Sequence, residues 1–351
     1  MFLEIKNKIE AELSNFICSI DKLYFLNKIS SLLFNTIKEF VSREGKRIRP
    51  TLFIIGYLGF AKKPAPGLYR TALSLELLHD FMLVHDDIID KSPTRRGKPS
   101  VHAALNKHLN SRKNLKFNGE DLAIVVGDVI YAMAINAFLS VKEDMKHKEM
   151  ALKKLTEAAF YTGSGEFIEL IYGMKSIDEI TKEDIYKIYD LKTATYTFAA
   201  PLAMGATLAG EKENEVQKLF NYGIYLGRAF QIKDDILGMF SSQKEMGKSN
   251  LTDLQEAKKT LLIWHAYNHS DRKNKSEIKR ILSNNNVNKS DLSRIRGIIT
   301  SCGSMDYAKK EINALIIKAE NLNKTFRMAL KYKNSLNAYS RKLLFIKILN
   351  G

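Results

Sequence analysis

The chain has 351 residues, and 45% of them are hydrophobic, which is ample for a buried core. Its formal net charge is +16, but the basic residues are scattered along polar stretches and no nucleic-acid-binding motif accompanies them. We therefore expect no nucleic-acid partner, and interpret the charge as solvated surface with a small subset of cations for anionic substrates.

The two cysteines, Cys18 and Cys302, have neither zinc-ligand spacing nor a disulfide framework, which suits a reduced compartment. Residues 1–15 mix acidic and basic side chains with apolar ones, unlike a signal peptide. No stretch approaches the ~18 uninterrupted apolar residues that a membrane span needs. We expect a cytoplasmic protein with no stable membrane insertion. Since no linker-like stretch divides the chain, one all-helical domain over 1–351 is predicted.

Apolar residues at helical spacing through residues 2–40 predict two packed helices, which can serve dimerisation. Residues 45–50 (GKRIRP) then break the pattern and predict a compact cationic loop that ends at Pro50. Lys46 offers a mobile point charge to phosphate oxygens, and Arg49 offers a planar fork. Taken alone, such a loop is more often a plain surface turn.

Residues 75–90 (LELLHDFMLVHDDIID) are rich in Leu and lack Gly and Pro, so a helix is predicted. Asp86 and Asp90 lie one turn apart on one face, Asp87 flanks them, and His79 precedes them by two turns. Clustered carboxylates repel unless a cation neutralises them. Mg²⁺ prefers such oxygens and keeps positions open for substrate phosphates. The alternative, a solvated acidic helix end, fits poorly with the apolar residues between the acids.

Residues 91–100 contain two prolines and a glycine and predict a loop that carries Arg95 and Arg96 just beyond the acids. Residues 106–119 are polar and basic and predict a surface loop rather than a flap. The following apolar helix contains Asp128, which we expect to be buried and to accept hydrogen bonds within the core.

A helix over residues 180–204 contains Lys192 and Thr193, and residues 227–238 (GRAFQIKDDILG) predict another. The latter carries Asp234 next to Asp235, in an apolar setting like the first acidic helix. Two such helices facing each other can hold a cluster of Mg²⁺ ions bridged by a diphosphate, which the metals make a good leaving group.

Two further stretches lie beyond the second acidic helix. Residues 269–291 are rich in Asn, Lys and Ser and predict loops with no information about chemistry. Residues 295–339 resume helical spacing and are expected to close the bundle.

The ordered set of motifs, from Gly45–Pro50 to residues 304–308 (SMDYA), resembles that of the trans-isoprenyl diphosphate synthases. These enzymes make farnesyl, geranylgeranyl and longer prenyl diphosphates. The motifs cover most of the chain, and the set is far more specific than either acidic cluster alone. The resemblance implies an all-α fold of the isoprenoid synthase type, a helical bundle around a central cavity, and a homodimer.

The resemblance also assigns roles to individual residues. It implies about three Mg²⁺ ions per active site, held by Asp86, Asp90 and Asp234. The residues implied to bind isopentenyl diphosphate are Lys46, Arg49, His79 and Arg96. Those implied to bind the allylic diphosphate are Arg95, Lys192, Thr193, Gln231, Lys248 and Lys258. The residues implied to promote the reaction are Asp86, Asp90, Arg95, Lys192, Asp234 and Lys258.

Two positions depart from the family pattern. Gly238 stands where the family normally has the third Asp of its second cluster, so one ligand or supporting acceptor is lost. Asp234 must then carry the third metal, with Asp235 supporting it. Ala257 stands where the family usually has Gly before the second lysine, which is a mild change.

The same resemblance addresses the length of the product. Phe81 and Met82 precede Asp86 by five and four residues, positions that line the pocket for the growing chain in the family. On spacing alone, both are ordinary core residues. One ring beside a flexible thioether suggests a deeper pocket than two rings would. Geranylgeranyl diphosphate is therefore the predicted main product, with farnesyl diphosphate as the alternative.

Three rivals remain: a class I terpene cyclase, a non-catalytic subunit of a prenyl synthase, and a helical scaffold with scattered charges, which leaves the ordered set of motifs unexplained. A cyclase has an Asn/Ser/Glu triad on its second metal helix and no need for a second diphosphate site. Here Asp234 and Asp235 occupy that helix, and the cationic loop is present. Non-catalytic subunits commonly lose the first acidic cluster, which is intact in this chain.

Overall fold

The structure, a computed structural model, describes residues 1–110, 115–241, 251–284 and 286–344. Over these residues all regular structure is helical, apart from one antiparallel pair of two-residue strands, so the all-α prediction is confirmed. The chain divides into two compact units. Unit 1 comprises residues 1–152 and 204–210, and unit 2 comprises residues 153–203 and 211–351. The single domain over 1–351 stays a prediction.

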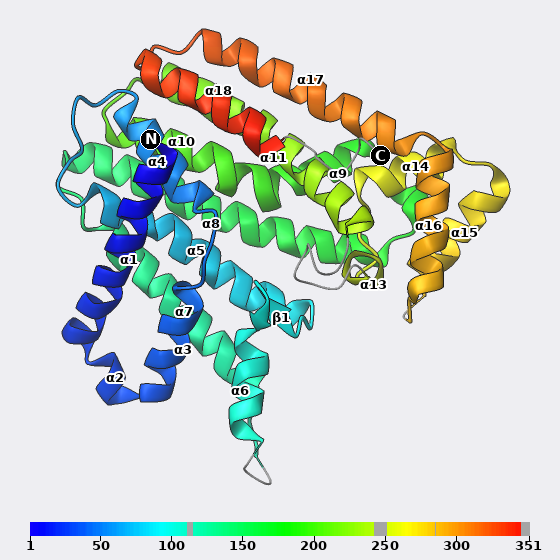
Figure 1. Ribbon diagram of the computed structural model, residues 1–351, viewed down its shortest axis with the longest axis horizontal. Helices are drawn as coiled ribbons and strands as arrows, with labels where there is room; N and C mark the ends of the chain where they lie inside the picture. The colour runs from blue at the N-terminus through cyan, green and yellow to red at the C-terminus, as the bar shows by residue number, and fades with distance from the viewer. Residues whose placement is uncertain (111–114, 242–250, 285, 345–351) are drawn as a thin grey trace. The chain divides into compact units, whose positions relative to one another are not determined.

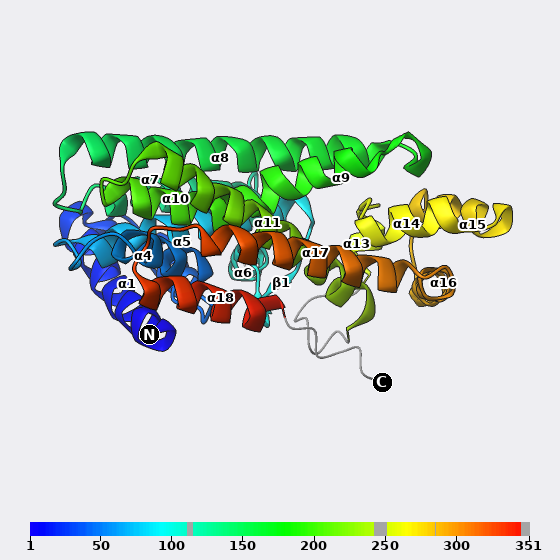
Figure 2. The same ribbon diagram turned by 90° about the horizontal axis from the view of Figure 1, so that it is seen from above.

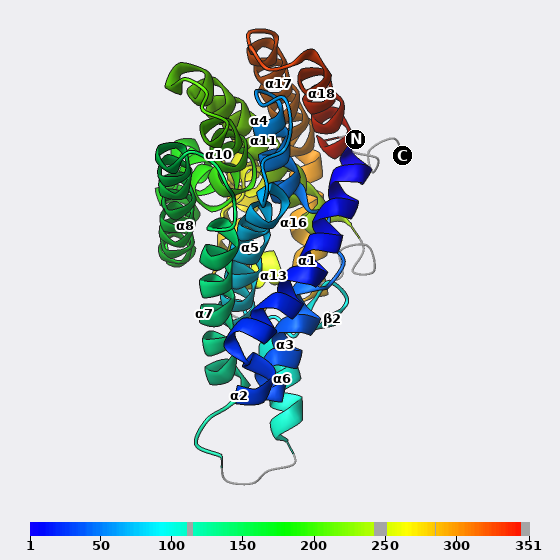
Figure 3. The ribbon, with the colours of Figure 1, turned by 90° about the vertical axis from the view of Figure 1, so that its left-hand side faces the viewer.

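Unit 1 is built on two helices that lie side by side, α5 (Leu68–Ile89) and α7 (Gly119–Phe138) (Figures 1 and 3). They approach closely because Gly127 has no side chain: a Cβ there would lie 2.3 Å from the His85 ring. Around them pack α1 (Phe2–Tyr24), α2 (Leu26–Ile29), α3 (Ser31–Val41), α4 (Ile48–Leu58), β1 (Thr94–Arg95), β2 (Lys98–Pro99) and α6 (Val101–Leu109).

Helix α7 is also the one helix within the described ranges that is long and apolar enough to cross a membrane. Length and composition alone give that result, and 44% of its most apolar window is buried inside the protein. Its contacts with α5, α6 and α3 are those of a core helix in unit 1.

The cationic loop ends earlier than predicted. Helix α4 begins at Ile48, so Arg49 and Pro50 lie in its first turn, where a proline is tolerated because the missing N–H has no intrahelical partner. Arg47 precedes the helix with a left-handed φ of 50° and is fully buried. Its guanidinium donates to Glu76 of α5 at 2.7 Å and to Glu10 of α1 at 2.8 Å. The middle cation of the loop therefore fixes the loop onto the core.

Unit 2 is centred on the long helix α11 (Glu213–Phe240), with α17 (Ser304–Lys324) and α18 (Leu330–Leu344) along it (Figures 1 and 2). The segment η2 (Tyr189–Ala199), wound as a π-helix, packs on another side of α11. Gly227 permits this approach, since a Cβ there would lie 2.3 Å from Ala194 Cα. The remaining elements are η1 (Ile177–Glu179), α9 (Lys182–Ile188), α13 (Thr252–Gln255), α14 (Leu261–His269), α15 (Arg272–Leu282) and α16 (Lys289–Ser301).

Two helices run from one unit into the other, α8 (Met145–Met174) and α10 (Ala200–Leu208).

The loop predicted over residues 269–291 is wrong for much of its length, because α15 occupies Arg272–Leu282. Asp271 caps this helix by accepting a hydrogen bond from the Asn274 amide at 2.8 Å. The helix buries Ile278 and Ile281, which lie three residues apart on one face. The sequence prediction missed this amphipathic helix because the segment is mostly polar and the helix buries only these two apolar side chains.

Candidate active site

The carboxylates of the first acidic cluster point in different directions. Asp86 and Asp90 are partly exposed, and one oxygen of each lies within 4.8 Å of the other. Asp87 is buried and accepts a hydrogen bond from Arg95 Nε at 2.7 Å. Burial raises the pKa of Asp87 to about 6, although Arg95 acts in the opposite direction. Asp86 and Asp90 thus offer the hard oxygens that suit Mg²⁺, and Asp87 anchors Arg95.

Arg95 and Arg96 lie on the short β1–β2 hairpin. Arg43 holds this hairpin by donating to the carbonyl oxygens of Arg95 at 3.2 Å and Pro99 at 2.8 Å. Arg95 Nη2 also lies 3.3 Å from Asp86 Oδ2, beside the predicted metal ligands. Arg96 Nη2 lies 3.7 Å from Asp80 Oδ1 on α5. The hairpin thus brings both predicted arginines to the same helix as the acids.

His79 lies among the predicted cations of unit 1. Burial lowers its pKa well below the ordinary range, and the charges of Arg49, Arg96 and Arg95 lower it further. A neutral imidazole can donate one hydrogen bond to a diphosphate oxygen without competing with the arginines for a counter-charge. Lys46 is exposed. The structure therefore brings Arg49 and Arg96 near His79, and the binding of isopentenyl diphosphate by these residues and Lys46 stays a prediction.

Sequence reasoning missed the acidic residues beneath this cationic group. Glu76 is buried and binds Arg47, while Asp80 is fully buried and neither of its carboxylate oxygens has a hydrogen-bond donor. Burial raises the pKa of Asp80 well above its usual range, and the neighbouring Glu76 acts in the same direction. The sequence signal that could have identified Glu76 and Asp80 was their spacing. Residues four apart share one face of a helix, and this face of α5 is otherwise apolar.

In unit 2, Lys192 is enclosed by acidic side chains from α8. Its ammonium lies 2.6 Å from Glu166 Oε2 and also contacts Glu169. Gly165 permits this approach, because a Cβ there would lie 2.8 Å from the Lys192 backbone nitrogen. The two glutamates had not been predicted. Their separation of three residues on one helix was the only sequence signal.

A chain of hydrogen bonds connects Thr193 with the second acidic pair. The Thr193 hydroxyl donates to Gln231 Oε1 at 2.7 Å, and Gln231 Nε2 donates to Asp235 Oδ1 at 2.9 Å. Asp235 is buried and also accepts a hydrogen bond from the Tyr189 hydroxyl, whereas Asp234 is partly exposed. Asp234 is thus the member of the pair that remains accessible to a metal. Tyr189 was not predicted.

The segment that carries Lys258 shows why the family has a glycine before that lysine. Ala257 has a left-handed φ of 51°, which glycine adopts without strain and alanine adopts at a cost of about 1 kcal/mol. Lys258 lies 2.6 Å from Glu256, and Lys259 is buried and donates to the Gly173 carbonyl at 2.6 Å. Burial lowers the pKa of Lys259 to about 8. Lys248 lies outside the described residues.

The two residues predicted to control product length lie on α5 in partly exposed positions. The Phe81 ring packs between two others, with centroid distances of 4.7 Å to His85 and 5.1 Å to Tyr131 of α7. Met82 is its direct neighbour. The expectation that Asp128 is buried is wrong, because 67% of its side chain is exposed and it lies 3.8 Å from His85 Nε2. Asp128 shares an exposed face of α7 with Ile124 and Val125, which are 43% and 53% exposed.

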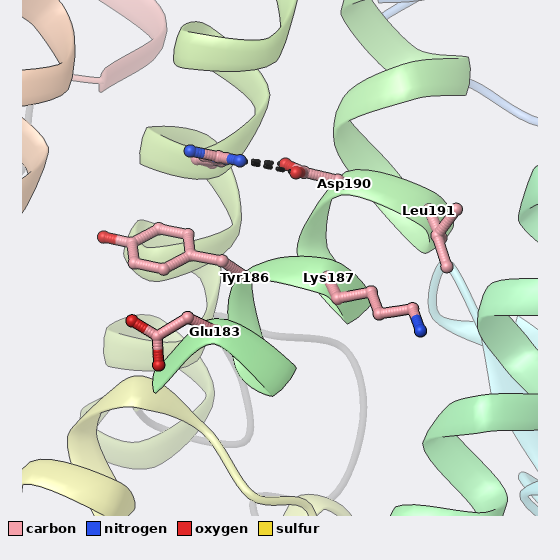
Figure 4. Close-up of a pocket in the computed structure, with 6 residues that line it drawn as sticks. Glu183, Tyr186, Lys187, Asp190 and Leu191 are labelled. Atoms are coloured by element: carbon pink, nitrogen blue, oxygen red, sulfur yellow. Dashed lines mark hydrogen bonds and ion pairs between the residues drawn. The ribbon is translucent and has the colours of Figure 1, made fainter. Parts of the chain in front are cut away.

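A pocket of about 420 Å³ in unit 2 is lined by none of the predicted site residues (Figure 4). Its lining comprises Glu183, Tyr186, Lys187, Asp190, Leu191 and Arg228. Arg228 donates two hydrogen bonds to Asp190, at 2.6 and 2.5 Å, and stacks 4.9 Å from the centre of the Tyr186 ring. These charges already neutralise one another, so the pocket gives no indication of a ligand.

Comparison with known proteins identifies relatives that are all prenyl diphosphate synthases. A profile described as polyprenyl synthetase matches residues 30–299. The geranylgeranyl diphosphate synthase of Saccharolobus solfataricus is 32% identical, with 97% of each chain covered. The short chain isoprenyl diphosphate synthase of Methanocaldococcus jannaschii is also 32% identical, over 87% of this chain and 84% of that protein.

Solved structures agree with these sequence relatives. The geranylgeranyl pyrophosphate synthase of Corynebacterium glutamicum, complexed with isoprenyl diphosphate and magnesium, superposes with a TM-score of 0.87. The two chains are 23% identical, and 97% of this chain and 98% of that chain are covered. This similarity concerns the fold, and it confirms the predicted fold class.

Proposed function

The chain belongs to the polyprenyl synthetase family, and on that premise we propose that it is a short-chain prenyltransferase that joins isopentenyl diphosphate to an allylic diphosphate. The observation that carries the proposal is the arrangement around Asp86 and Asp90, two accessible carboxylates beside Arg95. The hairpin that holds Arg95 also brings Arg96 to the group around His79, where a second anion can bind.

The reaction begins with cleavage of the allylic C–O bond. Asp86, Asp90 and Asp234 would hold about three Mg²⁺ ions, which supply Lewis-acid stabilisation of the charge that develops on the departing diphosphate. Arg95, Lys192 and Lys258 bind the same diphosphate and favour its departure, with Thr193, Gln231 and Lys248 completing that site. Lys192 can exchange its two glutamate partners for phosphate oxygens, which present similar acceptors.

The second substrate provides the new carbon–carbon bond. Lys46, Arg49, His79 and Arg96 hold the diphosphate of isopentenyl diphosphate, so that its double bond attacks the allylic cation. Loss of a proton to the released diphosphate then gives a product five carbons longer. Holding both substrates in one orientation supplies much of the rate acceleration. No side-chain nucleophile is required.

We propose geranylgeranyl diphosphate as the main product, with farnesyl diphosphate as the alternative. A relative that is 32% identical over 97% of this chain carries the name geranylgeranyl diphosphate synthase. The ring of Phe81, supported by Tyr131, would form the floor of the pocket for the growing chain, while Met82 can move aside.

Incubation of the purified protein with isopentenyl diphosphate, Mg²⁺ and each allylic starter, followed by chromatographic sizing, tests both parts of the proposal. The expected result is Mg²⁺-dependent formation of geranylgeranyl diphosphate. Phe81→Ala should shift the products to longer chains, because removing the ring opens the floor, and Phe117→Ala, at a phenylalanine that is 70% exposed, is the matched control. Absence of any elongated product would refute the proposed prenyltransferase activity. An unchanged distribution of product lengths in Phe81→Ala would refute the proposal that Phe81 forms the floor of the pocket.

We also propose that the protein is a cytoplasmic homodimer. Its substrates are water-soluble diphosphates, which suits an aqueous compartment. Helix α8 exposes large apolar side chains along its unit 2 portion, among them Phe160, Phe167 and Met174, which are 71%, 66% and 82% exposed. A second copy of the chain would remove such a surface from water. Sedimentation analysis of the purified protein tests this proposal.

A further inference from the structure

The Tyr189 hydroxyl lies at a junction of three elements of unit 2. Tyr189 belongs to η2 and is 5% exposed. Its hydroxyl donates to Asp235 Oδ2 of α11 and accepts a hydrogen bond from the Leu261 amide, the first residue of α14, at 3.0 Å. The hydroxyl thus donates its one proton to Asp235 and accepts the Leu261 N–H on its oxygen. Phenylalanine has no hydroxyl, so a phenylalanine at this position would remove both hydrogen bonds.

Each of the two groups served by Tyr189 is attached to a predicted binding residue. Asp235 follows Asp234 directly, and its other oxygen accepts a hydrogen bond from Gln231, which in turn accepts one from Thr193. Leu261 follows Lys258 by three residues, across a segment that Lys259 ties to the Gly173 carbonyl. One buried hydroxyl therefore connects the part of α11 that carries Gln231 and Asp234 with the first residue of α14, to which the segment from Lys258 leads.

We infer that Tyr189 is a positioning residue for the allylic diphosphate, which sets the direction of Asp234 and Gln231 on one side and of the Lys258 segment on the other. The inference rests on the proposed function. Tyr189 touches neither substrate nor metal in this role. It acts by holding Asp235 inward, because a buried carboxylate that lost this donor would turn toward other donors and carry its neighbours with it.

A neighbouring tyrosine provides a matched control. Tyr186 lies on α9, with its ring centroid 6.1 Å from that of Tyr189, and its hydroxyl donates to Glu311 at 2.6 Å. Each Tyr→Phe change removes one hydroxyl that binds a carboxylate within the same unit. Figure 4 shows Tyr186 beside the pocket on α9, and none of the predicted site residues lines that pocket. The two variants thus differ in which carboxylate loses its donor.

The test compares Tyr189→Phe and Tyr186→Phe with the wild-type enzyme. We expect Tyr189→Phe to raise the KM for the allylic diphosphate and the Mg²⁺ concentration at half-maximal rate by about tenfold, the factor that corresponds to loss of one charge-assisted hydrogen bond. The KM for isopentenyl diphosphate should stay unchanged, because its predicted residues lie in unit 1. Tyr186→Phe should match the wild type in all three quantities.

Amide hydrogen exchange gives a readout that does not depend on turnover. The Leu261 amide should exchange faster in Tyr189→Phe than in the wild type, and not in Tyr186→Phe, since only the first change removes its acceptor. If Tyr189→Phe does not fold, Asp235→Asn in the intact chain should give the same rise in the allylic KM.

The outcomes separate the inference from the function on which it rests. An inactive wild type would refute the proposed function. An active wild type with an unchanged allylic KM in Tyr189→Phe would overturn the inference alone. Equal rises in the KM values of both substrates, or the same allylic effect in Tyr186→Phe, would also overturn it, because a general loss of stability would then explain the change.

Discussion

Replacing Arg47 by methionine tests the division of labour within the cationic loop. The Arg47 side chain is fully buried and binds Glu76 at 2.7 Å, Glu10 at 2.8 Å and the Arg43 carbonyl at 3.0 Å. Methionine fills a similar volume but leaves Glu76, which is 3% exposed, without its main cation. Removing one partner of a buried ion pair costs about 3–5 kcal/mol.

The lower end of that range applies here, because Arg96 Nη2 lies 3.9 Å from the same Glu76 oxygen and offers partial compensation. A loss of about 3 kcal/mol corresponds to a fall in Tm of roughly 6–12 °C for a unit of this size. Arg49→Met is the matched control from the same loop, since Arg49 is only partly buried. It should change the free energy of unfolding by less than about 1 kcal/mol while raising the KM for isopentenyl diphosphate by about ten- to a hundredfold.

Thermal and urea unfolding, followed by circular dichroism, measures both variants. If Arg47→Met unfolds within about 1 kcal/mol of the wild type, the pair does not stabilise the loop. If Arg49→Met is the less stable of the two, the assignment of the structural and substrate-facing cations must be exchanged.

Three further predictions concern the site and the pH dependence of folding. Asp86→Ala should lose nearly all turnover with an unchanged circular dichroism spectrum, because alanine favours a helix, whereas Asp128→Ala should retain activity. Arg49→Ala should raise the KM for isopentenyl diphosphate and Lys192→Ala that for the allylic substrate, each by about ten- to a hundredfold; a rise in the same KM in both would contradict two separate sites. Burial lowers the pKa of His265 to about 4, so the unfolded chain binds more protons than the folded one between about pH 6.5 and 4. Stability should therefore fall as the pH decreases through that window, and His265→Gln should flatten the dependence of Tm on pH.

The positions of the residues that we propose to face the substrates could be predicted because helix geometry converts spacing into position. Asp86 and Asp90 are four residues apart, so any helix through them places both on one face. Lys46 and Arg49 share a short cationic segment in the same way. Such local signals require no knowledge of what packs behind them. The proposed chemistry of each set therefore rests on local sequence alone and does not require the tertiary fold.

The residues that hold these groups in place could not be predicted, because their partners are distant in the chain. Glu10 and Arg47 are 37 residues apart, and Tyr189 and Asp235 are 46 apart. A carboxylate on one helix gives no local sign of the donor that another helix brings to it. Asp128 shows the same limit, since the apolar sequence around it suggested burial and only the packing of α7 decided its exposure.

The two acidic pairs share one principle despite their different surroundings. Adjacent residues on a helix point about 100° apart, so both members of a pair cannot face the same ligand. In the first pair Asp87 turns inward and binds Arg95, and in the second Asp235 turns inward and binds Tyr189 and Gln231. A buried carboxylate is stable only with such donors, so each inward Asp ties its helix to a second element.

The outward Asp of each pair is then left in a fixed direction for a metal. This argument also accounts for Gly238, which is buried one turn beyond Asp234. A missing carboxylate there removes neither the outward Asp234, which we propose as the ligand, nor the inward anchor Asp235. The second motif therefore has one outward carboxylate that we propose as a ligand and one inward anchor, and the first motif has the same two parts with Asp90 as a further proposed ligand.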